Sequence, residues 1–149
     1  EDLMLQFAGA NNPLYLIRKK ENETSPILHE ADEETLKKLP APMVNNSFVL
    51  HEVKGDKMPI SIFYRMDRLK THEIQLQKGD QLYLFSDGFA DQFGGEKAGK
   101  FKFKNFKQLL LNNAHLSMNE QQNILDKTFS DWKGNLDQVD DVVVVGVRI

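Results

Sequence analysis

The chain has 149 residues, which fits one domain, and its 40% apolar residues are enough for one core. Its 19 basic and 22 acidic residues leave a net charge of -3, so nothing in the charge favours nucleic acid as a partner. The absence of cysteine excludes disulfides, thiolate metal sites and a thiol nucleophile. No apolar run approaches the roughly 20 residues that cross a bilayer. We therefore expect one cytoplasmic domain over residues 1–149, with no membrane segment.

The first third of the chain reads as short strands separated by polar loops. Residues 3–8, with Gln6 as the one polar break, and residues 14–17 are apolar runs. The Gly-Ala-Asn-Asn-Pro run between them favours a turn, so the pattern predicts a β-hairpin. Residues 48–53 and 60–64 are the next predicted strands. In the polar stretch before them, the pattern predicts only a short helix, capped by Asp32 and continuing to Leu39.

Later residues alternate strands with two helices. Residues 73–77, 81–86 and 142–149 are predicted strands, and the last is so continuously apolar that we expect it inside a sheet. In the second of these, Leu82, Leu84 and Ser86 share one face.

Apolar residues at helical spacing predict helices at 105–113 and 117–132. The second helix has Ser117 as N-cap, Glu120 completing a capping box, and Gly134 at its end. Strands first and helices late indicate the α+β class.

Two acidic segments adjoin predicted strand ends. Asp87 and Asp91 follow the strand 81–86, and Asp140 precedes the strand 142–149. A carboxylate at a strand end can project into the rim of a sheet, and two such segments could meet at one edge. Carboxylate oxygens are ligands that Mg²⁺ and Mn²⁺ prefer. The alternative stays open, because Asp-Gly is also a turn signal and Asp beside a strand often serves only to cap or solubilise it.

Lysines and phenylalanines interleave between the two acidic segments. Five lysines between Lys97 and Lys107 form a basic cluster, which is either a solvated loop or a patch that meets an anionic substrate. Phe101, Phe103 and Phe106 alternate with them, and either form a substrate-facing flap or pack against the neighbouring helix.

Three motifs occur in order along nearly the whole chain. They are Gly-Ala-Asn-Asn-Pro-Leu-Tyr at 9–15, Lys-Gly-Asp-Gln-Leu-Tyr-Leu-Phe-Ser-Asp-Gly at 78–88, and Asp-Asp-Val-Val-Val-Val at 140–145. With these motifs the sequence resembles the SpoIIE-type branch of the PPM phosphatases, which are metal-dependent protein serine/threonine phosphatases of bacterial signal transduction. The resemblance implies two antiparallel β-sheets packed as a sandwich and flanked by helices. This chain would be the C-terminal portion of that domain, incomplete at its N-terminus.

The resemblance also implies a chemistry. Two Mn²⁺ or Mg²⁺ ions would activate a water for in-line attack on a phosphoserine or phosphothreonine of a phosphoprotein substrate. Asp87 and Asp140 would be metal ligands, and Asp91 is a weaker candidate for an additional ion. Gly88 and Asp141 would support the site, and no catalytic residue is expected beyond the metal ligands.

One motif of the family is missing from the sequence. The resemblance implies an Asp-x-x-Gly-His-Gly segment before residues 9–15, which supplies the carboxylate that bridges both metals. We therefore expect the 149-residue chain by itself to bind metal poorly and to be inactive. The alternative is a catalytically dead, phosphatase-like interaction module. An incomplete sandwich also predicts a homodimer through an exposed sheet edge, for which residues 3–8 are the candidate.

Overall fold

The computed structural model describes residues 3–22, 39–58 and 68–149. The expected helix capped by Asp32 and the expected strand at 60–64 lie outside these ranges. The elements in chain order are β1 (Leu3–Phe7), β2 (Leu14–Lys19), the short 3-10 helix η1 (Lys20–Asn22), β3 (Met43–Val44), β4 (Phe48–Val53), β5 (His72–Leu76), β6 (Gln81–Phe85), α2 (Gly88–Asp91), β7 (Phe93–Gly94), β8 (Gly99–Lys100), α3 (Phe103–Asn113), α4 (Met118–Lys133) and β9 (Val144–Arg148).

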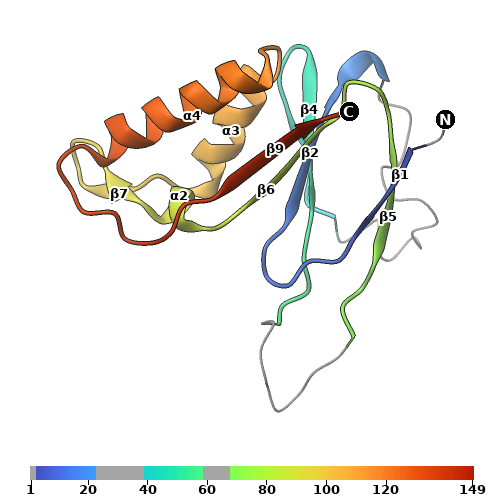
Figure 1. Cartoon of the computed structure of the whole chain (residues 1–149), viewed down its shortest axis with the longest axis horizontal. Coiled ribbons are helices and arrows are strands. Elements are labelled where there is room, and N and C mark those ends of the chain that lie inside the picture. The colour runs from blue at the N-terminus through green and yellow to red at the C-terminus, as the bar shows by residue number, and fades with distance from the viewer. Residues whose placement is uncertain (1–2, 23–38, 59–67) are drawn as a thin grey trace.

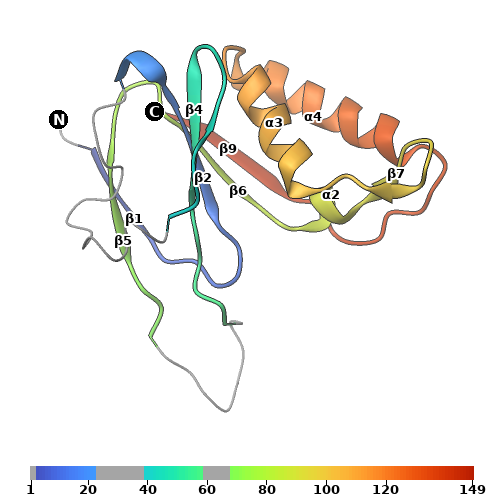
Figure 2. The ribbon, with the colours of Figure 1, turned by 180° about the vertical axis from the view of Figure 1, so that it is seen from behind.

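A five-stranded antiparallel sheet in the order β3-β4-β2-β6-β9 forms the centre of the molecule. A separate antiparallel pair, β1-β5, lies on one side of this sheet, and α3 and α4 lie on the other (Figures 1 and 2). The mixed α+β class with antiparallel sheets is therefore confirmed. In the described part of the chain both long helices cover the same face.

β2 is buried on both faces because a separate core lies on each side of it. Tyr15 and Ile17 contribute to the core under the helices, whereas Leu14 and Leu16 contribute to the core under β1-β5. This arrangement explains why β2 lacks the polar-apolar alternation of a half-exposed strand.

Aromatic side chains dominate the core between the sheet and the helices. The Phe85 and Phe106 rings meet edge to face with centroids 5.1 Å apart, and Phe89 and Phe101 pack in the same way at 5.1 Å. Phe101 packs edge to face on Trp132 of α4, so packing against a helix is confirmed for this residue. Phe106 of α3 is buried, while Phe103 stays 39% exposed. The described part of the chain contains no helix that is long and apolar enough to cross a membrane.

The predicted hairpin between residues 3–8 and 14–17 is wrong. β1 pairs with β5, and β2 pairs with β4 and β6, so the intervening turn carries the chain from one sheet to the other. The turn is bound to a third segment instead: Asn11 N donates to the Asp56 carbonyl, and Asp56 N donates to the Gly9 carbonyl, each at 2.8 Å. The turn residues specify a reversal of the chain but not the partner of each strand.

A buried ion pair fixes the start of β6 to β2. The Arg18 guanidinium donates to both carboxylate oxygens of Asp80, at 2.9 and 2.5 Å, and both side chains are nearly inaccessible. Arg18 also donates to the Gln75 carbonyl, and Asp80 accepts from Gln77 N. Two charges can be buried here because each is paired and hydrogen-bonded.

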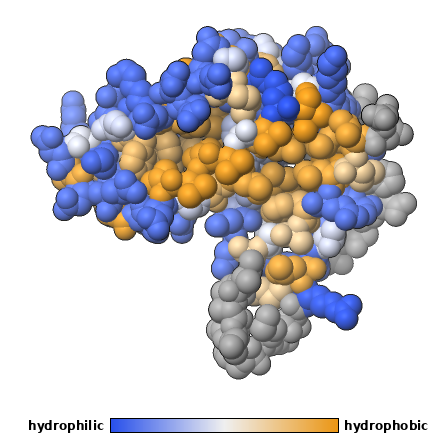
Figure 3. Space-filling model, in the orientation of Figure 1, coloured by the Kyte–Doolittle hydropathy of each residue, from blue (hydrophilic) through white to orange (hydrophobic). Residues whose placement is uncertain are grey.

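The last strand lies at an edge of the central sheet, so the prediction of an interior position is wrong for the described structure. There β9 pairs with β6 and with no other strand. Val143, Val145 and Val147 are 54%, 49% and 47% exposed. Figure 3 shows the resulting apolar band along β6 and β9. A continuous apolar run indicates burial on both faces, but among the described residues the core under β1-β5 contains side chains of β2, β4 and β6 and none of β9.

Candidate metal site at the end of β6 and β9

The two acidic segments lie side by side where β6 ends and β9 begins. Ser86 makes this junction: its N–H donates to the Val143 carbonyl at 3.0 Å, and its Oγ donates to the Asp141 carbonyl at 2.8 Å. The same Oγ accepts a hydrogen bond from Val143 N at 3.0 Å. Residues 55 positions apart are thus joined by side-chain and main-chain bonds, because β6 and β9 pair antiparallel.

Gly88 permits the close approach of the two segments. A Cβ at this position would lie 2.4 Å from the carbonyl oxygen of Asp141 and 3.2 Å from a methyl group of Val142. The first distance is far inside van der Waals contact, so a side chain here would push residues 137–141, the acidic loop, away from α2. Gly88 itself is buried.

The carboxylates of Asp87 and Asp140 remain at the surface. Asp87 directly precedes α2, but its side chain makes no capping hydrogen bond to that helix. Oδ1 of Asp140 accepts from Asp141 N at 2.7 Å, and both aspartates are exposed.

Exposed carboxylates on adjoining segments fit a hard divalent cation in the type of ligand. They are few in number, since the described ranges contain no group of three or more His, Cys, Asp or Glu residues that could hold a metal. The ligand roles of Asp87 and Asp140, and the supporting roles of Gly88 and Asp141, stay predictions.

The carboxylate of Asp91 already forms an ion pair. It lies one helical turn after Asp87, and its Oδ1 is 3.1 Å from Nζ of Lys100 on β8. Nζ of Lys100 also lies 5.9 Å from the centre of the Phe93 ring. A cation at Asp91 would compete with Lys100, so the prediction of an additional ion at Asp91 gains no support from this geometry.

A second lysine of the basic cluster is also paired within the chain. Lys107 forms an ion pair with Glu52 and lies 5.3 Å from the centre of the Tyr15 ring. Two of the five clustered lysines therefore have acidic partners in this chain. Whether the cluster meets an anionic substrate stays open.

Sequence reasoning missed Gln92, the buried residue between α2 and β7. Its side chain is fully buried, and its Nε2 donates to the Asp137 carbonyl at 2.9 Å. Its Oε1 accepts from Val139 N at 3.3 Å. The only signal in the sequence is a glutamine between Asp91 and Phe93, which does not distinguish a buried amide from an exposed one.

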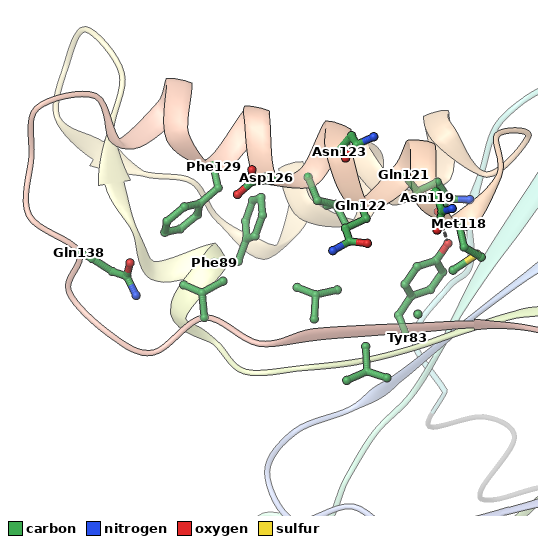
Figure 4. Close-up of a pocket in the computed structure, with 15 residues that line it drawn as sticks. Tyr83, Phe89, Met118, Asn119, Gln121, Gln122, Asn123, Asp126, Phe129 and Gln138 are labelled. Atoms are coloured by element: carbon green, nitrogen blue, oxygen red, sulfur yellow. Dashed lines mark hydrogen bonds between the residues drawn. The ribbon is translucent and has the colours of Figure 1, made fainter.

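A groove of about 770 Å³ lies between α4 and β9, beside the acidic loop (Figure 4). Gln138 lies at one end and Met118 at the other, with Phe129 and Phe89 between them. Near the Met118 end, the Tyr83 hydroxyl donates to Oε1 of Gln121. Burial raises the pKa of Tyr83 to about 12, so the side chain is neutral at ordinary pH.

Comparisons with known proteins agree with this arrangement. The chain superposes on the structure of the SiaA-PP2C domain of Pseudomonas aeruginosa with a TM-score of 0.69 and 26% identity. The match covers 98% of this chain and 46% of the SiaA-PP2C chain.

A second structure shows the same fold. It contains the PP2C phosphatase domain and a fragment of the regulatory domain of the cell fate determinant SpoIIE from Bacillus subtilis, and gives a TM-score of 0.58 at 19% identity. The match covers 98% of this chain and 34% of that one, so the chain spans less than half the length of both structures. No curated protein matches the chain.

The family comparison covers the part of the chain that contains both acidic segments. The model for stage II sporulation protein E (SpoIIE) matches residues 38–149. With that match and the two structural similarities, this chain belongs to the SpoIIE family and has the fold of a PP2C phosphatase domain.

Proposed function

We propose that residues 1–149 belong to a single metal-dependent protein serine/threonine phosphatase domain, as its C-terminal portion, and that the substrate is a phosphoprotein. The observation that carries the proposal is the junction of the two acidic segments through Ser86, which brings two carboxylates to one edge of the sheet. Membership of a phosphatase family supports the reaction class. The complete domain would be a two-sheet sandwich with helices on both outer faces.

Each residue of the junction has a distinct part in the proposal. Asp87 and Asp140 would hold Mn²⁺ or Mg²⁺, two ions in the complete domain. When bound, such ions supply Lewis acidity and an activated water for phosphoester hydrolysis. Gly88 keeps the backbone of α2 against the acidic loop, and Ser86 joins the loop to the end of β6.

Replacing the two aspartates tests the proposal. In the complete protein, Asp87→Asn and Asp140→Asn should each lower Mn²⁺-dependent hydrolysis of a phosphoserine peptide by at least about 100-fold, since each removes a charge and a hard ligand. The unfolding free energy should change little, because both side chains are exposed. Asp131→Asn is the matched control, because this exposed aspartate on α4 pairs with Lys127 and, within the described ranges, with no other cation. Near-normal turnover of either variant at saturating Mn²⁺ would remove that residue from the ligand set.

A second candidate is an interaction module without catalysis. It is favoured by the lack of a three-ligand group in the described ranges and by the exposed apolar side chains of β9. If this reading holds, the complete protein should bind no Mn²⁺ in calorimetry and should hydrolyse no phosphopeptide, while Val145→Lys should weaken its binding to a partner.

A further inference from the structure

We propose that Gln92 is a positioning residue, which holds the acidic loop at residues 137–139 and thereby sets Asp140 beside Asp87. The consequence for metal binding rests on the function proposed above. The consequence for the loop does not, because it concerns contacts within this chain alone.

The side chain of Gln92 uses both ends of its amide to hold the loop. Nε2 donates to the Asp137 carbonyl at 2.9 Å and to the Phe93 carbonyl at 3.0 Å, and Oε1 accepts from Val139 N at 3.3 Å. The side chain is fully buried, so water does not compete for these bonds.

The main chain of Gln92 is itself fixed in place. Its N–H donates to the Gly88 carbonyl at 3.1 Å. Its carbonyl accepts from Phe101 N and from Nε1 of Trp132, both at 3.0 Å. The amide therefore projects from a rigid corner, between α2 and the base of the β7-β8 hairpin, toward the loop.

The loop has little else to hold it. Every residue from 134 to 141 is exposed, so the loop buries no apolar anchor of its own. Among the described residues, Gln92 is the only side chain outside the loop that hydrogen-bonds to residues 137–139. Ser86 holds the other end, at Asp141 and Val143. Asp140 lies between these two anchors, and the loss of either would let its carboxylate move.

A near-isosteric variant separates this role from packing. Gln92→Met keeps the volume of the side chain and deletes its hydrogen bonds. Gln121→Met is the matched control, because Gln121 is also a buried glutamine with several hydrogen bonds but joins α4 to Gln81 and Tyr83. Both variants should lose some stability, and only Gln92→Met should loosen the loop.

Two readouts on the complete protein decide the proposal. We expect the Val139 amide to exchange with solvent about 10-fold faster in Gln92→Met and the Mn²⁺ dissociation constant to rise about 10-fold, as when a group that orients a metal ligand is lost. Gln121→Met should stay within about two-fold of the unmodified protein in both. Unchanged exchange, or faster exchange with unchanged Mn²⁺ affinity, would overturn the positioning role.

The same measurements separate a failure of the proposed function from a failure of this inference. If the unmodified protein binds no Mn²⁺ while Gln92→Met still loosens the loop, the metal site is wrong and the hold on the loop stands. If Gln92→Met does not fold, Val139→Pro removes the N–H that Gln92 accepts, from an exposed position. It should then raise the Mn²⁺ dissociation constant about as much, and an unchanged constant would count against the proposal.

Discussion

Gly88 illustrates how one residue determines whether two distant segments can touch. A Cβ at this position would lie 2.4 Å from the carbonyl oxygen of Asp141, so the absence of a side chain leaves room for that carbonyl. We expect Gly88→Ala to lower the free energy of unfolding by about 1–3 kcal/mol, because the obstructing atom belongs to the backbone and cannot rotate away. Urea unfolding measures the loss.

Gly99→Ala is the control for the Gly88 substitution. No atom lies within 4 Å of a Cβ built at Gly99, so the change in unfolding free energy should stay within about 0.5 kcal/mol. Equal effects of the two substitutions would mean that the contact between α2 and the acidic loop is not as close as described.

Tyr83 makes the stability of the fold depend on pH in alkaline solution. Burial raises its pKa from 10.0 to about 12, against smaller lowering effects of the Arg148 charge and the Gln121 hydrogen bond. A raised pKa means that the folded protein holds the proton more tightly than the unfolded chain. The contribution of protonated Tyr83 to the free energy of unfolding is therefore complete below pH 10 and is lost as the pH rises toward 12.

The pH dependence of unfolding tests this. Urea unfolding of the unmodified protein should show a falling free energy between pH 10 and pH 12. Tyr83→Phe should make that decline shallower, and Tyr15, whose pKa is also raised by burial, should keep part of it. The same variant should lower stability at pH 8 by about 1 kcal/mol, because the buried Gln81 and Gln121 amides lose a partner. Identical slopes for both proteins would contradict the assignment to Tyr83.

At the scale of elements, α4 is the best-defined helix in the sequence and in the structure. Ser117 accepts from Glu120 N, and the Glu120 carboxylate accepts from Ser117 N, so the predicted capping box is confirmed. Ser117→Ala should lower the unfolding free energy by about 1 kcal/mol, because helix donors lose their acceptor. Ser130→Ala, exposed in the same helix, should change it by less than about 0.5 kcal/mol in thermal or urea unfolding.

The capping box also predicts a response to acid. The hydrogen bond from the Ser117 side chain, with that from its backbone, lowers the pKa of Glu120 below its ordinary 4.5. A lowered pKa stabilises the fold above pH 4.5, and that stabilisation is lost as the pH falls through the folded value. In Ser117→Ala this part of the acid dependence should become smaller, because the side-chain hydrogen bond is lost while the backbone N–H of residue 117 can still donate to Glu120. If Ser117→Ala leaves the acid dependence of the unfolding free energy unaltered, the capping box does not form in solution.

At the scale of the whole molecule, the uncovered face of β6 and β9 is the feature that favours self-association. Leu84 and Val145 pair across the two strands and are 47% and 49% exposed. Unpaired edges with apolar side chains tend to pair with another chain. We expect concentration-dependent association in light scattering, and Val145→Lys should reduce it.

The sheet edge predicted from the sequence, at residues 3–8, supplies the variant for comparison with Val145→Lys. Met4 on β1 is 42% exposed, and Met4→Lys places a charge there instead. If Met4→Lys disrupts association and Val145→Lys does not, the interface lies at β1, as the homodimer prediction has it. A monomer at every concentration would refute both locations.

The sequence by itself determined what depends on neighbouring residues. The strands β4, β5 and β6, the capping box of α4 and the turn at residues 9–13 depend on local patterns, and each appears where expected. The order of three motifs also sufficed to identify the family, although the metal-ligand roles of Asp87, Asp140 and Asp91 stay predictions.

Only the tertiary structure decided which strands pair and which faces are covered. β1 pairs with β5 rather than with β2, and β9 lies at an edge rather than inside the sheet, because pairing depends on segments far along the chain. The role of Gln92 was hidden for the same reason: its partners lie 45 and 47 residues away, and an amide has no periodic signature. Local patterns fix each element, whereas partners and burial follow from how the elements pack together.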